Sequence, residues 1–391
     1  MIVRHLSLSR PRFVKIREIN VQETAHLLPS NVFAIILAGG SGTRFWPKSR
    51  HKRPKQLCQI GDSDYTMIEL TLRRLDGLVP RERRIVVTHI DQVEDTQKIT
   101  GKLCQHYLAE PSAKNTANAL ALAALEVQEI ARAQGIENPI ILSLHADALI
   151  KRIDVFTDTI KAMIASSMKG KLTLLGITPE YPETGYGYIE KGAALDGLKA
   201  TYQVDSFREK PDVALATKYI ETKRFLWNSG IFAWQVSTIL DELRAFVPNS
   251  VKVLSEVLGK EKSFTHLPAE SFAAAYKSLQ SIAIDPAVLE KSKKVTVVEA
   301  DIGWKDVGSW EALAQSFPTD EQGNLFYGEV INIDSTGTTV DSDARVVACI
   351  GLKDMVVVCS EGAILVCPRD RAQDVKYIVE ELKKRNKMDL V

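Results

Sequence analysis

The sequence lacks paired cysteines, a long apolar run and an excess of either charge. Its cysteines show no Cys-x-x-Cys spacing, which argues against a zinc site or a disulfide framework; they are Cys58, Cys104, Cys349, Cys359 and Cys367. No apolar run approaches the roughly 18 residues of a membrane-spanning helix. Fifty basic against 49 acidic residues leave a net charge of +1, so nothing indicates binding to nucleic acid or to a membrane surface. These absences predict a cytoplasmic protein without nucleic-acid or membrane partners.

The first thirty residues lack the apolar core of a secretory signal and mix Arg and Lys with polar positions. We interpret residues 1–30 as an N-terminal extension, either an arm packed on the core or the product of an early start codon. The full length of 391 residues is enough for one large domain and a smaller one.

What the sequence does contain is a glycine-rich segment at the end of an apolar run. Val32–Leu37 is typical of a buried strand, and the string LAGGSGTRFWP begins at Leu37 and ends at Pro47. Glycine backbone at a strand end can approach a phosphate closely and point N–H groups at its oxygens. Arg44 and Lys55 add cations nearby. The string fits neither the P-loop nor the Rossmann fingerprint. A plain turn is the alternative, but strand, loop and cations together favour a nucleotide-phosphate site.

Strand-like apolar runs alternate with helical patterns over the first three hundred residues. Runs at 84–88, 140–144 and 171–176 read as strands, and the Ala/Leu-rich segment 116–133 reads as a helix. This alternation predicts an α/β fold with a Rossmann-like, mostly parallel sheet and helices on both faces. Such sheets bind ligands at the carboxyl ends of their strands.

After about Gly323 the pattern changes to short strands separated by Gly, Asp and Ser turns. A charged helix from about Arg371 to Lys387 follows. We therefore predict a catalytic domain over residues 31–322 and a small C-terminal β domain over residues 323–391. Two roles for this β domain stay open: it covers the active site or forms a homodimer, or it is a structural cap.

Six further strings place charged or polar side chains beside glycine, proline or strand-like runs. Each has a plain structural alternative: a helix cap for Asp147, Asn115 or Thr116, a solvated charge cluster at 207–211, and ordinary turns elsewhere. The strings are EPSAKNTA at 110–117, HADA at 145–148, TGYGYIE at 184–190, FREKP at 207–211, WNSGIF at 227–232 and WKDVGSW at 304–310.

Together with the glycine string and Pro54–Gln56, these segments resemble the signature of the sugar-1-phosphate nucleotidyltransferases. The Phe-Trp-Pro and Pro-Lys-Gln portions look most like the mannose-1-phosphate guanylyltransferase branch. The resemblance spans roughly residues 32–387, and the tail is similar to a left-handed β-helix-like module of that family. It implies Mg²⁺-dependent transfer of GMP from GTP to mannose 1-phosphate, with GDP-mannose and pyrophosphate as products.

The resemblance also implies roles for individual residues. Arg44 and Lys55 would be catalytic and neutralise the triphosphate, and Asp147 and Asp306 would bind the metal. The sugar phosphate would contact Gly187, Glu190, Lys210 and Asn228. The nucleotide would contact Leu37, Ala38, Gly39, Gly40, Gly42, Thr43, Glu110, Asn115 and Thr116.

One departure from the family pattern lies beside the first acid. The family usually has Pro-x-Asp-His, whereas this chain has His145-Ala146-Asp147-Ala148. The change leaves open a catalytically weak paralogue that binds sugar nucleotides for regulation, although retention of the other charged residues argues against it. A second alternative keeps the chemistry with another sugar or base, such as glucose 1-phosphate. A structural assembly role would rest on the C-terminal β region alone.

Overall fold

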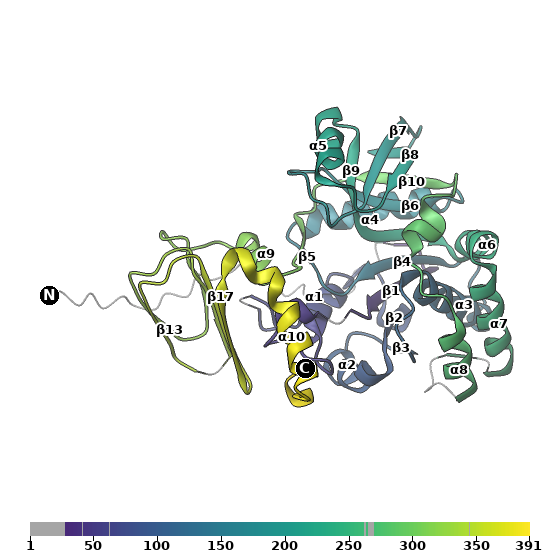
Figure 1. Cartoon of the computed structure of the whole chain (residues 1–391). Helices are drawn as coiled ribbons and strands as arrows, with labels where there is room; N and C mark the ends of the chain where they lie inside the picture. Colours follow the sequence, from purple (N-terminus) through teal and green to yellow (C-terminus); the bar gives the residue numbers. More distant parts are fainter. Residues whose placement is uncertain (1–27, 41, 62, 262, 265–269, 344) are drawn as a thin grey trace.

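The computed structural model describes residues 28–40, 42–61, 63–261, 263–264, 270–343 and 345–391. Two lobes lie side by side, a large one built on a long sheet and a smaller one of short strands (Figure 1). The extension predicted for residues 1–30 lies outside the described residues except for 28–30. None of the helices in the described ranges is long and apolar enough to cross a membrane.

The large lobe is built on a sheet with the strand order β3-β2-β1-β4-β9-β6-β10-β8-β7. The strands from β3 to β4 are parallel, whereas β9 runs antiparallel to both its neighbours β4 and β6. The predicted strands form β1, β2, β4 and β6, which confirms the fold class. The bounds are β1 Val32–Ala38, β2 Arg84–His89, β3 His106–Glu110, β4 Ile140–His145, β6 Leu172–Ile177, β7 Tyr188–Ala194, β8 Thr201–Arg208, β9 Phe225–Gln235 and β10 Val295–Glu299.

Helices cover both faces of this sheet because its strands are apolar on both sides. In β1, Phe33 and Ile35 belong to one buried cluster with α3, α6, α7 and α8. Ala34 and Ile36 belong to a second cluster with α1, α2, α4 and α5. The bounds are α1 Met67–Arg73, α2 Val93–Thr100, α3 Thr116–Gln134, α4 Ile153–Ser167, α5 Val213–Thr222, α6 Val236–Phe246, α7 Pro248–Glu261 and α8 Glu270–Ser278. A further helix, α9 Trp310–Ser316, packs in a third buried cluster.

The small lobe is a β-helix-like coil. Successive strands alternate between two parallel sheets, β12-β14-β16 and β13-β15, and β17 adds antiparallel to β16. The bounds are β12 Leu325–Tyr327, β13 Val330–Ile333, β14 Thr339–Ser342, β15 Val347–Ile350, β16 Met355–Ser360 and β17 Ala363–Pro368. The boundary predicted between residues 322 and 323 stays a prediction.

The last helix, α10, is shorter than the sequence pattern indicated. It covers Val375–Lys384, and residues 369–374 before it form a tighter 3₁₀ turn that follows Pro368. At the other end Asn386 takes a left-handed backbone, with φ of 54°, a conformation that commonly ends helices. The prediction of one helix over 371–387 was therefore wrong at both ends.

The two lobes are joined through the segment that follows the glycine loop. Phe45 and Trp46 share a buried cluster with apolar side chains of β16, β17 and α10. Lys48 is buried, and its Nζ lies 2.7 Å from Asp341 Oδ1 and 3.1 Å from Asp343 Oδ1. The small lobe thus packs directly against the chain between the glycine loop and Lys55.

Candidate active site

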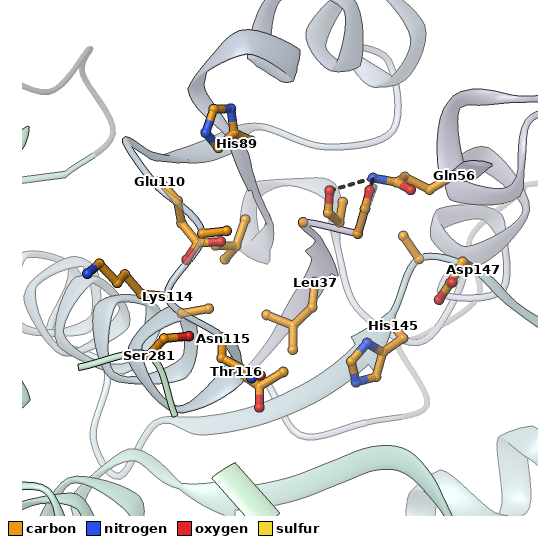
Figure 2. Close-up of a pocket in the computed structure, with 17 residues that line it drawn as sticks. Leu37, Gln56, His89, Glu110, Lys114, Asn115, Thr116, His145, Asp147 and Ser281 are labelled. Atoms are coloured by element: carbon orange, nitrogen blue, oxygen red, sulfur yellow. Dashed lines mark hydrogen bonds between the residues drawn. The ribbon is translucent and has the colours of Figure 1, made fainter. Parts of the chain in front are cut away.

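A cavity of about 380 Å³ opens where β1, β3 and β4 end at their carboxyl edges. Figure 2 shows Glu110, Asn115 and Thr116 on one side of Leu37, and His145 and Asp147 on the other. Of the residues predicted to bind nucleotide, the lining includes Leu37, Ala38, Gly39, Gly40, Glu110, Asn115 and Thr116. The site therefore lies at the strand ends where the α/β pattern predicted it.

Gln56 holds the glycine loop against the end of β1. Its buried side chain donates hydrogen bonds to Ala38 O at 2.7 Å and to Gly40 O at 3.2 Å (Figure 2). Thr88, at the end of β2, also donates to Ala38 O at 3.2 Å. Because these bonds occupy loop carbonyls, they fix the peptide planes that line the cavity. The sequence contained Gln56 in a family string, but no residue pattern indicated this role.

Glycine is required at position 42 by its backbone conformation and by the neighbouring Lys55. Its φ is +58°, and a Cβ at this position would lie 2.6 Å from Lys55 Cβ. Both facts exclude an ordinary side chain. The loop therefore closes on Lys55, and Thr43 and exposed Arg44 follow in a short 3₁₀ turn. Gly42, Thr43, Arg44 and Lys55 do not line the cavity.

Lys55 joins the two predicted metal-binding acids. Its buried ammonium lies 3.2 Å from Asp147 Oδ2 and 3.9 Å from Asp306 Oδ1. The acids come together because β5, Ala148–Ile150, pairs antiparallel with β11, Trp304–Asp306. Their side chains are 42% and 44% exposed, so both can take a further ligand. The two acids thus lie on the same ammonium group, and their binding of a metal ion stays a prediction.

The two carboxyl groups share Lys55 unequally. For Asp147, partial loss of hydration acts to raise the pKa, but Lys55 and then His145 bring it below its ordinary value. For Asp306, partial loss of hydration raises the pKa above its ordinary value, with Lys55 opposing and Asp147 adding to the rise. One ammonium is therefore not enough to compensate both carboxylates, and a bound cation would stabilise their charged forms.

The acid pair suits a small, hard metal ion. Carboxylate oxygens are the ligands of such ions, which usually keep water and substrate phosphate as further ligands. In the part of the chain that the structure describes, no group of three or more His, Cys, Asp and Glu side chains is arranged to hold a metal. A metal ion at this site would therefore be bound by the two carboxylates together with oxygens of the substrate.

Glu110 forms the far wall of the cavity and is itself buried. The hydroxyl of Tyr276, on α8, donates to Glu110 Oε1 at 2.6 Å. Burial raises the pKa of Glu110 to about 7, although the Tyr276 hydrogen bond opposes the rise. Asn115 is the N-cap of α3, and its Oδ1 accepts from Thr116 N at 2.8 Å. The capping interpretation of Asn115 is therefore correct, and its contact with nucleotide stays a prediction.

The three strings predicted to bind the sugar phosphate are hydrogen-bonded to one another. Asn228 N donates to Gly187 O at 2.8 Å, and Lys210 N donates to Tyr186 O at 3.2 Å. Lys210 Nζ lies 2.8 Å from Glu209 Oε1. A Cβ on Gly187 would lie 2.7 Å from Glu209 Oε2, so glycine leaves room for this ion pair.

Glu190 has other partners. It lies 3.3 Å from Arg224 Nη2 and accepts from Ser206 Oγ at 2.8 Å. Its role in binding sugar stays a prediction.

His145 and Gly230 connect the two halves of the site. His145 lines the cavity, and a Cβ on Gly230, whose φ is +72°, would lie 2.7 Å from His145 Cδ2. Because Gly230 follows Asn228 by two residues, the part of β9 that carries Asn228 packs against the imidazole at the end of β4. The departure from the family pattern at residue 145 therefore falls where the two halves meet.

Comparison with known proteins agrees with this geometry. The family model described as nucleotidyl transferase matches residues 33–323, and one described as MannoseP isomerase/GMP-like beta-helix domain matches residues 328–382. A mannose-1-phosphate guanylyltransferase of Escherichia coli is 35% identical over 362 residues, which cover 91% of this chain and 76% of that protein. The xanthan biosynthesis protein XanB of Xanthomonas campestris pv. campestris (strain B100) is 39% identical, with 90% and 74% covered.

A solved structure supports the same relationship. The crystal structure of a mannose-1-phosphate geranyltransferase from Thermus thermophilus matches with a TM-score of 0.79 and 32% identity, covering 90% of this chain and 99% of that one. The range matched by the nucleotidyl transferase model, residues 33–323, includes both the cavity and the acid pair. This chain therefore belongs to the nucleotidyl transferase family and is a nucleotidyltransferase enzyme.

Proposed function

We propose that this enzyme transfers GMP from GTP to α-D-mannose 1-phosphate, giving GDP-mannose and pyrophosphate. The observation that carries the proposal is the meeting of Asp147 and Asp306 on Lys55 at the edge of a glycine-lined cavity. The choice of substrates is supported by relatives named mannose-1-phosphate guanylyltransferase, which match about nine-tenths of the chain.

In this reaction a phosphate oxygen of the sugar phosphate attacks the α-phosphorus of GTP in line. A new P–O bond forms, the bond between the α-phosphorus and its oxygen bridge to the β-phosphate breaks, and pyrophosphate leaves with the electron pair. Negative charge crowds the transition state, so catalysis consists mainly of positioning and charge neutralisation. Lys55 and Arg44 would supply cations, and the backbone of Gly39 and Gly40, which line the cavity, would approach the phosphates.

Nucleotidyl transferases generally use a divalent metal ion, and we infer that it is Mg²⁺ here. Asp147 and Asp306 would hold it, since Mg²⁺ is usually bound through one or two carboxylates and substrate phosphates. The bound ion would stabilise negative charge on the phosphoryl oxygens. On the sugar side, Lys210 would bind the phosphate of the attacking substrate, and Asn228 and Glu190 would bind hydroxyl groups.

The test is pyrophosphate release from purified protein with Mg²⁺, across GTP, ATP, UTP and CTP, each paired with mannose 1-phosphate or glucose 1-phosphate. Turnover confined to GTP with mannose 1-phosphate is the expected result. Turnover with another pair would keep the reaction type and overturn the substrates. A folded protein that is silent with every pair would instead support a paralogue that only binds sugar nucleotides. The homodimer and the cytoplasmic location stay predictions.

A further inference from the structure

The amide of Asn228, on the sugar side of the site, is held in a single orientation. Its Oδ1 accepts a hydrogen bond from Gly230 N at 3.1 Å, and its Nδ2 donates to Asp285 Oδ1 at 2.9 Å. Among the described residues no partner is found for the second N–H of Nδ2. This hydrogen is therefore the one that Asn228 can offer to a ligand.

Asp285 belongs to no string that sequence analysis singled out. It begins a short π-helical turn, Asp285–Leu289, whose Ala287, Val288 and Leu289 are buried in the main core. The turn is thereby fixed to the body of the large lobe. The side chain of Asp285, the first residue of the turn, is therefore fixed in position and can act as a rigid acceptor for the Asn228 amide.

The segment that leads to Asp285 is hydrogen-bonded to the start of α3, which lies on the nucleotide side of the site. Ile284 N donates to Thr116 Oγ1 at 2.9 Å, Ala117 N donates to Ile282 O at 3.2 Å, and Asn118 Nδ2 donates to Gln280 O at 2.9 Å. Ser281, within the same stretch, lines the nucleotide cavity, and Figure 2 shows it near Asn115 and Thr116. Residues 280–285 therefore connect the start of α3 with the sugar side.

Charged groups around Asp285 also belong to the sugar side. Burial and then the Glu209 carboxylate raise the pKa of Asp285 to about 7, while Lys210 and the Asn228 hydrogen bond oppose the rise. Glu209 and Lys210 are the ion pair described above. Asp285 is thus hydrogen-bonded to the asparagine expected to bind the sugar's hydroxyls, and its charge interacts with the lysine expected to bind the sugar's phosphate.

We propose that Asp285 is a positioning residue of the sugar 1-phosphate site, which orients the Asn228 amide so that its free N–H meets a sugar hydroxyl. The inference rests on the proposed function, because it assigns Asp285 to the substrate that attacks GTP. Because Asp285 acts through Asn228, its replacement should weaken binding of the sugar phosphate and not binding of the nucleotide.

The test is steady-state kinetics of the full-length enzyme with GTP, mannose 1-phosphate and Mg²⁺. Asp285→Ala is expected to raise KM for the sugar phosphate about tenfold, the effect of one lost hydrogen bond. KM for GTP and kcat stay near wild type. Asp285→Asn keeps an acceptor oxygen for Asn228 and restores KM. Glu290→Gln, at an exposed position just after the same turn, is the matched control and should leave both KM values and kcat unchanged.

A double-mutant comparison separates positioning from a merely structural role. Because residues that act as a unit are not additive, Asp285→Ala adds little to KM when Asn228→Ala is already present. Additive effects, an equal rise in KM for GTP, or no change in Asp285→Ala would each overturn the inference. If Asp285→Ala does not fold, Asp285→Glu serves instead, since it moves the acceptor by one methylene and is expected to raise KM similarly.

Failure of the proposed function is distinguishable from failure of this inference. A wild-type enzyme without turnover contradicts the proposed function, and GDP-mannose binding by calorimetry then decides the inference. Equal dissociation constants for wild type and Asp285→Ala would overturn it, and weaker binding by the variant supports it.

Discussion

At the scale of single residues, Glu110 shows how burial changes the chemistry of a cavity wall. The residue is 7% exposed and is held by Tyr276, and its pKa of about 7 follows first from burial. A carboxyl group with a raised pKa binds a proton more tightly in the folded chain than in the unfolded one. Over the interval between the two pKa values, stability therefore falls as pH rises.

Replacing Glu110 with Gln removes this dependence while an oxygen remains to accept from Tyr276. We expect the melting temperature of Glu110→Gln, relative to that of wild type, to be higher at about pH 8 than at about pH 5. Only wild type loses stability as its carboxyl group at position 110 ionises over this interval. Glu137→Gln, at an exposed position, is the control. Thermal unfolding followed by circular dichroism at both pH values measures the two melting temperatures. A difference between variant and wild type that is the same at both pH values would contradict the assigned pKa.

At the scale of elements, the pairing of β5 with β11 assembles the acid pair. Each strand has only three residues, and they are more than 150 positions apart in the chain. Asp306 lies opposite Ala148, the neighbour of Asp147. The pairing thus brings together two acids that are far apart in the chain.

Asp306→Asn is expected to lower kcat/KM by at least about 100-fold, since a metal site contributes several kcal/mol of charge stabilisation. It should also raise the Mg²⁺ concentration needed for half-maximal rate. GDP-mannose binding by calorimetry should persist. Asp301→Asn is the control, because its ion pair with Arg152 is exposed and such pairs contribute little. Unchanged kinetics in Asp306→Asn would remove this residue from the metal site.

The elements that the sequence predicted are those with a local signal. β1, β2, β4 and β6 are continuous apolar runs because both faces of the sheet are covered. The hairpin β7–β8 is only partly buried, so its residues appeared as motifs and not as strands. The β5–β11 pairing depends on contacts distant in sequence, which no local pattern encodes. Gln56 and Asp285 were missed for a related reason: their positions depend on partners far along the chain.

At the scale of the whole molecule, Lys48 links the large lobe to the small lobe. Its buried ammonium lies between Asp341, which is 1% exposed, and Asp343. For the Lys48 pKa, burial acts downward, but Asp341 and Asp343 raise it above its ordinary value. The lysine is thus charged, and removing it would leave a buried carboxylate without compensation.

Lys48→Met is expected to lower the free energy of unfolding by about 3 kcal/mol, the lower end of the cost of breaking a buried ion pair. Urea unfolding at neutral pH measures it. Lys52→Met, four residues further on and exposed, should change little. Adding Asp341→Asn to Lys48→Met should recover part of the loss, because it removes the stranded charge. A Lys48→Met protein as stable as wild type would contradict this assignment.

The contact of Phe45 and Trp46 with the small lobe limits how modular this protein can be. A catalytic fragment ending before β12 would expose the apolar side chains that now pack on β16, β17 and α10. The stretch between the glycine loop and Lys55 would lose its packing partner. We therefore expect the smallest stably folded unit to include the small lobe, and we expect recombination between relatives to succeed only when this segment and the small lobe are exchanged as one block.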